Sequence, residues 1–208
     1  MQEAWAIREI NDEVIKISKQ LGVKNIIHYG GPGITENGEP IDNFNKYKDL
    51  NEKLKSENLN LVGVESGFFI DPFYWDVVTA GPKRDELIND LIIQIKDMAR
   101  AGVQMLGYTW MPLGPIRTEP KIIRGGSYGT AFDIKSNNLE LAGKNSIKIE
   151  HSNSFPINDI NFLTEEMLWQ NLEYWIKAVT PVAEEEGIRL GIHPDDPPVD
   201  NLGGVPRI

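Results

Sequence analysis

The stretch LINDLIIQIKDMARAGVQMLGYTW, residues 87–110, decides the fold class. Its first part repeats apolar residues at the spacing of one helix face, at Leu87, Ile88, Leu91, Ile92, Ile95 and Met98. This helix starts near Lys83 and ends at Gly102, and the apolar run over residues 103–110 is typical of a strand. A helix therefore passes through a short joint into a strand, which is the repeating unit of α/β proteins.

The same unit recurs on both sides of that stretch. Upstream, the apolar pattern predicts a helix over residues 7–21, a strand over 23–29, a helix over 43–57 and a strand over 59–65. Downstream, Thr164 is a suitable N-cap for a helix that Pro181 is expected to kink and Gly187 to end, before a strand over 189–193. The sequence thus predicts about four strands, and a chain that opens on a helix with an initial strand missing.

The lengths of the joints favour a barrel. Helix-to-strand joints are short and strand-to-helix joints are long, as in a (β/α)8 TIM barrel whose long loops build the active site. A doubly wound open sheet fits the alternation too, but Gly30-Gly31-Pro32-Gly33 lacks the G-x-G-x-x-G pattern of its phosphate loop. We predict an α/β fold, a partial TIM barrel over residues 1–208 as one domain. No closing element follows His193, so we expect the chain to be truncated and to continue beyond Ile208.

Composition excludes several classes of function. A net charge of −10 without a basic stripe disfavours nucleic acid, and no apolar run reaches the roughly 20 residues of a membrane span. No cysteine and no signal-peptide pattern make the cytoplasm the expected location. An anionic substrate would need a local cation, either arginine or a metal.

Two long loops stand out. Residues 111–161 show little periodicity, and we interpret them as a long inserted loop or lid region. Within this segment, the glycine-rich residues 125–129 suggest either a flexible lid or a hairpin. Residues 67–82 are rich in aromatic side chains, which we expect to cap the barrel mouth or to contact another subunit. These aromatics, with the open sheet edge, predict a homo-oligomer.

The run Ile192-His193-Pro194-Asp195-Asp196-Pro197-Pro198 is the sharpest chemical feature. A histidine at the carboxyl end of a buried strand points into the barrel mouth, where a neutral imidazole can bind a divalent metal. Asp195 and Asp196 could orient that imidazole or act as acid and base groups. The alternative is a turn with solvated acids and a histidine that bonds to a backbone carbonyl.

Other strand ends and loops supply further candidates. Glu65 ends one strand and could be a ligand or a base, although solvated acids are common there. Tyr108, Thr109 and Trp110 end another and would line a pocket wall, although aromatic side chains at strand ends more often serve packing. Arg117 and Arg124, in the long segment, could clamp a carboxylate with paired hydrogen bonds.

Several of these residues resemble the mannonate dehydratases. The run over residues 192–198, with Leu202-Gly203-Gly204-Val205-Pro206-Arg207-Ile208 after it, is similar to that family's H-P-D-D-P-P…R-I pattern. Shorter matches are spread along most of the chain: Tyr108-Thr109-Trp110-Met111-Pro112, Arg117-Thr118-Glu119, Ala131-Phe132-Asp133, residues 168–174 and residues 183–187. Departures are Thr109 in place of the family's asparagine, and Pro115-Ile116 in place of a tryptophan-containing segment, at positions where the family touches its substrate.

The resemblance implies a xylose-isomerase-like barrel and a lyase of the hydro-lyase class. Such an enzyme removes water from D-mannonate, or a related aldonic acid, to give 2-keto-3-deoxygluconate in glucuronate catabolism. It implies a divalent cofactor, Mn²⁺ or else Fe²⁺ or Co²⁺, with His193 as one metal ligand and the others beyond Ile208. It places Arg117, Tyr108, Trp110, Asp195 and Asp196 among the substrate-binding residues, and it leaves the catalytic residues unassigned. The alternatives are a sugar isomerase or epimerase that uses two strand-end acids on the same barrel, and an inactive barrel fragment.

Overall fold

The computed structural model describes residues 3–30, 42–66, 69, 72–112, 114–135, 163–202 and 205–208. Its centre is a sheet of five parallel strands in the order β1-β2-β3-β4-β7, the order in which they occur along the chain. These strands are β1 (Ala4–Ile7), β2 (Asn25–Tyr29), β3 (Asn60–Ser66), β4 (Met105–Thr109) and β7 (Arg189–His193).

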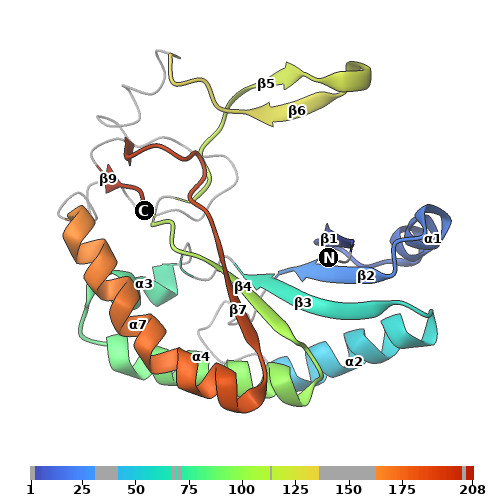
Figure 1. Ribbon diagram of the computed structural model, residues 1–208, viewed down its shortest axis with the longest axis horizontal. Coiled ribbons are helices and arrows are strands. Elements are labelled where there is room, and N and C mark those ends of the chain that lie inside the picture. Colours follow the sequence, from blue (N-terminus) through green and yellow to red (C-terminus); the bar gives the residue numbers. More distant parts are fainter. Residues whose placement is uncertain are drawn as a thin grey trace.

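The helices lie against one face of this sheet (Figure 1). They are α1 (Asp12–Leu21), α2 (Asn43–Ser56), the short α3 (Trp75–Thr79), α4 (Arg84–Arg100) and α7 (Glu165–Glu186). A doubly wound sheet reverses its strand order and carries helices on both faces. Strands in chain order with helices outside them are instead one part of a (β/α) barrel, so the predicted fold is confirmed.

The beginning of the chain corrects one prediction. The chain opens on β1, which pairs in parallel with β2 from Ala4 to Ile7, and not on a helix. Ile7 happens to fit the helical period of the residues after it, but α1 begins only at Asp12. The side chain of Asn11 accepts a hydrogen bond from the Val14 amide at 3.0 Å and so sets that start. The strand that we expected to be missing is therefore present.

The other helices follow the sequence pattern closely. Helix α7 begins after Thr164, whose hydroxyl accepts a hydrogen bond from the Met167 amide at 3.2 Å, and ends at Gly187 with a φ of 71°. It continues through Pro181 to Glu186. Its buried stripe packs onto the sheet at the spacing of one helix face and comprises Leu168, Leu172, Trp175, Val179 and Ala183.

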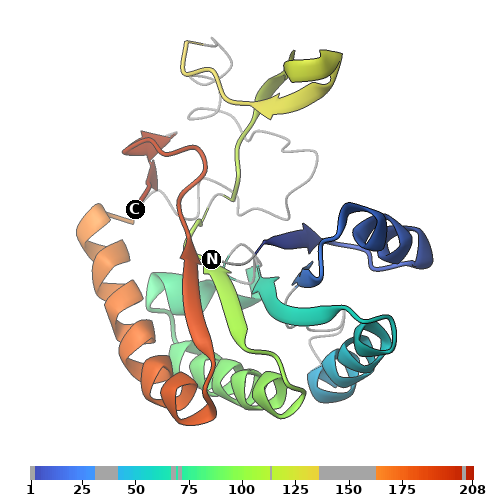
Figure 2. The same cartoon turned by 45° about the vertical axis from the view of Figure 1, so that its right-hand side comes forward.

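Two short antiparallel ladders lie outside the main sheet. Strands β5 (Thr118–Ile122) and β6 (Tyr128–Ala131) form a hairpin that projects away from the sheet (Figure 2). The hairpin alternative for residues 125–129 is thus confirmed, whereas residues 136–161 of the predicted lid region lie outside the described residues. Strands β8 (Asn201–Leu202) and β9 (Val205–Pro206) pair near the end of the chain. In the described part of the chain, every helix is too short or too polar to cross a bilayer.

Candidate functional site

The strand register decides which side chains leave the sheet on the face without helices. Leu106 is buried, and Tyr108 packs against Trp175 of α7, so these two side chains of β4 point toward the helices. Successive side chains of a strand alternate between faces, so Gly107 and Thr109 point the other way. Thr109 pairs in register with His193, which therefore lies on the helix-free face at the carboxyl end of β7. This is where the active sites of barrels lie.

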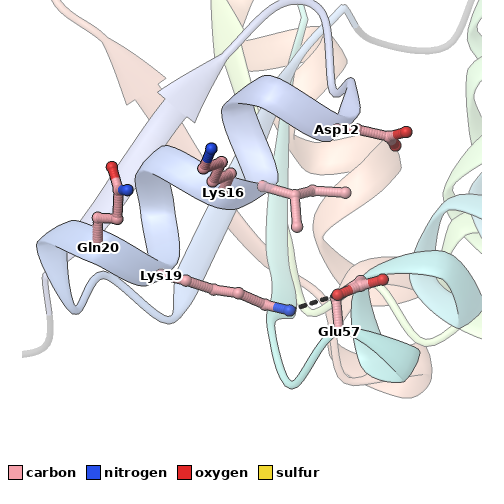
Figure 3. A pocket seen from close by; sticks show the side chains of 6 residues that line it. Asp12, Lys16, Lys19, Gln20 and Glu57 are labelled. Carbon is pink, nitrogen blue, oxygen red and sulfur yellow. Dashed lines mark hydrogen bonds and ion pairs between the residues drawn. The ribbon is translucent and has the colours of Figure 1, made fainter.

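A separate depression of about 330 Å³ lies in the outer layer, between α1 and α2 (Figure 3). An ion pair between Lys19 and Glu57 crosses it, and both side chains are nearly half exposed. It is on the helix side of the sheet and has no part in the arrangement around His193.

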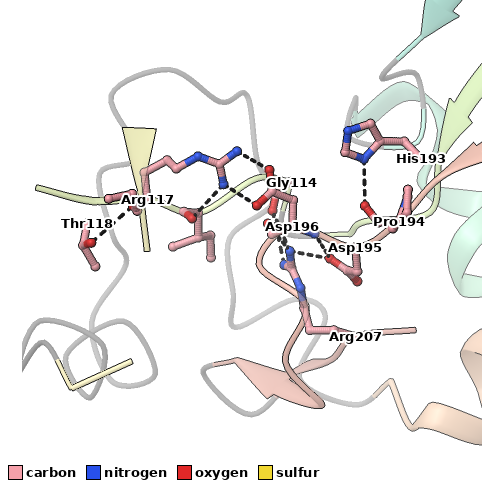
Figure 4. Close-up of polar contacts among 10 residues, drawn as sticks. Gly114, Arg117, Thr118, His193, Pro194, Asp195, Asp196 and Arg207 are labelled. Carbon is pink, nitrogen blue, oxygen red and sulfur yellow. Dashed lines mark hydrogen bonds and ion pairs between the residues drawn. The ribbon is translucent and has the colours of Figure 1, made fainter. Parts of the chain in front are cut away.

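The imidazole of His193 is exposed and oriented. Its Nδ1 lies 2.7 Å from the carbonyl oxygen of Pro194, and because a carbonyl only accepts, Nδ1 carries the proton (Figure 4). In the neutral ring the lone pair is then on Nε2, which forms no hydrogen bond within the described part of the chain. Such an imidazole suits one position of a divalent metal site. The described residues contain no group of three His, Cys, Asp or Glu side chains that could complete one.

Asp195 is buried in an ion pair. One of its oxygens lies 2.5 Å from Nη2 of Arg207, and their side chains are only 6% and 1% exposed. Burial raises the pKa of Asp195 to about 6, while the positive charge of Arg207 acts in the opposite direction. The same guanidinium donates to the carbonyl oxygens of Asp196 at 2.6 Å and Gly114 at 3.2 Å, so it joins the loops after β4 and β7.

Asp196 binds Arg117, one of the two arginines that we expected to bind a substrate carboxylate. Nη1 of Arg117 donates to Oδ1 of Asp196 at 2.6 Å and Nη2 donates to Oδ2, a paired geometry between residues 79 positions apart. Nη1 also donates to the Ile116 carbonyl at 3.1 Å. The two acids that adjoin each other in the sequence therefore contact different arginines, and Arg117 in this structure is already engaged. Arg207, which sequence reasoning quoted only as part of a motif, is the residue that connects this network.

Tyr108 and Trp110 belong to a buried aromatic cluster. The rings of Tyr108 and Trp175 are 4.6 Å apart, and Phe69 contacts Trp110 at 4.6 Å and Trp175 at 4.9 Å. Trp110 is 1% exposed. The structure brings these side chains together on the helix side and not with His193, so it gives them a packing role, and their contact with a substrate stays a prediction. Phe69 is a core residue too, which corrects its expected place in an exposed aromatic cap.

A parallel sheet in chain order, with helices outside and a strand-end histidine inside, defines a xylose-isomerase-like (β/α) barrel protein. The model of the D-mannonate dehydratase (UxuA) family matches residues 2–208, and the chain belongs to that family.

Individual relatives agree with this placement. The chain is 33% identical over 180 residues to the mannonate dehydratase of Streptococcus pneumoniae (strain 70585), covering 81% of this chain and 47% of that protein. It is 32% identical, with the same coverage, to the mannonate dehydratase of Streptococcus suis (strain 05ZYH33). The crystal structure of mannonate dehydratase from Streptococcus suis serotype 2 superposes with a TM-score of 0.77 at 27% identity, covering 100% of this chain and 56% of that one.

A more distant structure shares the fold alone. D-psicose 3-epimerase from Clostridium cellulolyticum H10 superposes with a TM-score of 0.51 at 12% identity, over 91% of this chain and 51% of that one. The chain spans about half the length of the curated relatives that it matches.

Proposed function

We propose that the protein acts as a metal-dependent hydro-lyase of the mannonate dehydratase type. It would remove a proton from C2 of D-mannonate and a hydroxide from C3, giving water and, after the enol rearranges, 2-keto-3-deoxygluconate. The observation that supports this most is the oriented, exposed imidazole of His193 on the helix-free face, in a chain that belongs to the family. Because the chain spans about half of its relatives, the activity is proposed for the whole protein.

The proposed cofactor is Mn²⁺, with Fe²⁺ or Co²⁺ as substitutes. His193 would supply one nitrogen ligand through Nε2, since its Nδ1–H is already held by a carbonyl. When bound, the metal supplies positive charge next to the carboxylate and hydroxyl groups where negative charge develops.

The contacts between the loops after β4 and β7 would fix the positions of the residues around the proposed metal site. Arg207 bonds to Asp195, Asp196 and Gly114, so the residues that follow His193 are fixed relative to the β4 loop. Arg117 is paired with Asp196, so it would have to exchange this carboxylate for that of an anionic substrate in order to bind one.

A sugar isomerase or epimerase on the same barrel is the second candidate. That chemistry needs two strand-end acids, and Glu65 is the only acidic residue within the five described strands of the main sheet. The family to which the chain belongs favours the dehydratase.

We further propose that the protein is a cytoplasmic homo-oligomer of glucuronate catabolism. The lack of cysteine suits a reducing compartment. The hairpin exposes Ile122 and Tyr128, and the segment after it exposes Ile134; a second copy would cover these side chains. Replacing Tyr128 by serine should then lower the mass measured by sedimentation equilibrium, and an unchanged mass would count against this interface.

The test of the dehydratase uses the purified full-length protein with Mn²⁺ and D-mannonate. We expect formation of a 2-keto-3-deoxy acid, detected colorimetrically. His193→Ala should abolish turnover and weaken Mn²⁺ binding measured by electron paramagnetic resonance. The control is Ile192→Ala, at an exposed position of the same strand that faces the other way. Full activity in His193→Ala would reject the metal-ligand assignment, and an epimerised sugar in place of the keto acid would support the second candidate.

A further inference from the structure

One level of the helix-free face combines polar side chains with glycines. Tyr29 of β2 pairs in register with Glu65 of β3, Glu65 with Gly107 of β4, and Gly107 with Gly191 of β7. Side chains in register on parallel strands share a face, so these four positions form one row across the sheet. Arg8, just after β1, extends the row, because its guanidinium lies 5.1 Å from the centre of the Tyr29 ring.

The polar half of the row has unused hydrogen-bonding capacity. Oε1 of Glu65 is buried and has no hydrogen-bond partner. The Tyr29 hydroxyl and the Arg8 guanidinium also form no hydrogen bond within the described part of the chain. Burial and the charge of Glu65 raise the pKa of Tyr29, so its hydroxyl keeps its proton. A buried carboxylate oxygen without a partner costs roughly 1–3 kcal/mol or more, which a ligand hydroxyl would recover.

Gly191, at the far end of the row, leaves space, because a Cβ added there would meet no atom within 4 Å. Gly107 is different, since a Cβ added there would lie 3.2 Å from Cγ of Glu65, whose side chain therefore packs against Gly107. Thr109, two residues beyond Gly107 on the same face, is 2% exposed, and its buried Oγ1 has no hydrogen-bond partner. His193 stands two residues beyond Gly191 in the same way. The open space therefore lies between the metal-ligand candidate and Glu65.

We propose that Arg8, Tyr29 and Glu65 form a subsite for the hydroxyl-bearing carbon chain of a polyhydroxy acid, which lies over Gly191 and extends toward the Glu65 carboxylate. Two strand spacings separate β3 from β7, about 10 Å, which suits an extended six-carbon chain. Glu65 accepts hydrogen bonds from hydroxyl groups and repels a carboxylate, so the acid end of the ligand lies toward His193. This subsite rests on the proposed dehydratase function and extends it to substrate selection.

Calorimetric titration of the full-length protein with D-mannonate and with D-mannitol, its uncharged counterpart, tests the subsite. We expect Glu65→Gln to weaken binding of both compounds at least about tenfold, since a hydrogen bond to a charged group is lost. If Glu65 acted only through its charge, its removal would instead strengthen binding of the anion. Gly191→Val should block both ligands by filling the space. Glu13→Gln, on the exposed face of α1, is the matched control and should change neither affinity.

The outcomes of these titrations test the proposed subsite separately from the proposed dehydratase activity. Unchanged or tighter D-mannonate binding in Glu65→Gln, unchanged binding in Gly191→Val, or no binding of either compound to the wild-type protein overturns the subsite. If a variant fails to unfold cooperatively on heating, Tyr29→Phe takes its place, with weaker binding expected. Wild-type binding that Glu65→Gln weakens, but without keto-acid formation, refutes the dehydratase and leaves the subsite standing.

Discussion

Replacing Arg207 by methionine removes the centre of the network that joins the two loops. The variant keeps most of the side-chain volume but loses the ion pair with Asp195. It also loses the hydrogen bonds to the carbonyl oxygens of Gly114 and Asp196. Because the Asp195 side chain is only 6% exposed, its carboxylate would be left without a counter-charge in a region that water barely reaches.

The size of the effect follows from this burial. Removing one partner of a buried ion pair costs about 3–5 kcal/mol, mostly because the remaining charge is uncompensated. Replacing both partners by apolar residues of similar size is often close to neutral. We therefore expect Arg207→Met to lose about 3–5 kcal/mol of unfolding free energy, and the double variant with Asp195→Leu to recover most of that loss.

Urea unfolding followed by tryptophan fluorescence measures both variants. With a slope of about 2 kcal/mol per molar urea, the single variant should unfold at a midpoint about 1.5–2.5 M lower than the wild type. The double variant should unfold near the wild-type midpoint and still lose activity, because the β4 and β7 loops are no longer joined. A single variant within about 0.3 M of the wild type, or a double variant no more stable than the single, would refute the uncompensated-charge argument.

Three further predictions concern the N-cap of α7, the half-buried His28 and the contact between Arg117 and Asp196. Thr164→Ala should cost about 1 kcal/mol of unfolding free energy through the lost N-cap bond of α7, and Thr164→Ser should not. Burial and the charge of Lys46 lower the pKa of His28, so the unfolded chain binds that proton more tightly. Between about pH 8 and about pH 5, the urea midpoint of the wild type should therefore shift downward relative to that of His28→Gln, whereas Asp195, whose raised pKa acts in the opposite direction, contributes equally to both proteins. Arg117→Lys cannot form the paired hydrogen bonds and should lower kcat/KM about tenfold, whereas Arg124→Lys in the exposed hairpin turn should not.

Local chemistry explains which elements could be predicted from the sequence. Helix α4 and strand β4 follow directly from apolar spacing and a glycine stop, and so does α7 with its Thr164 cap. Strand β1 cannot be predicted in this way, because four residues are too few to show a period. Only its pairing with β2, some twenty positions away, makes it a strand. Short strands are specified by their neighbours and not by their own residues.

The site shows the same division between local and distant information. Strand periodicity placed His193 correctly at the carboxyl end of its strand, on the face that the register then confirms. Nothing local distinguishes Asp195 from Asp196, yet one is buried against Arg207 and the other is paired with Arg117. Tyr108 and Thr109 are also neighbours in the sequence, yet their side chains lie on opposite faces of the sheet. Tyr108 packs against Trp175 on the helix side, and Thr109 lies on the same face as His193. This difference follows from the alternation of side chains along β4, and only once the structure shows which face the helices cover.

The contacts of Arg207 also give a physical reason why the sequence motif shared with the family extends over two separate runs, residues 192–198 and 202–208. The H-P-D-D-P-P run and the P-R-I run are separated by several residues, and sequence comparison alone does not explain why both should be needed. In the structure the second run supplies the arginine that neutralises the buried acid of the first, and the β8–β9 ladder brings the two runs together. A chain that kept Asp195 and lost Arg207 would bury an unpaired carboxylate two residues from the metal-ligand candidate. The two runs therefore act as one element, whose task is to hold the residues beyond His193 in a fixed position against the loop of β4.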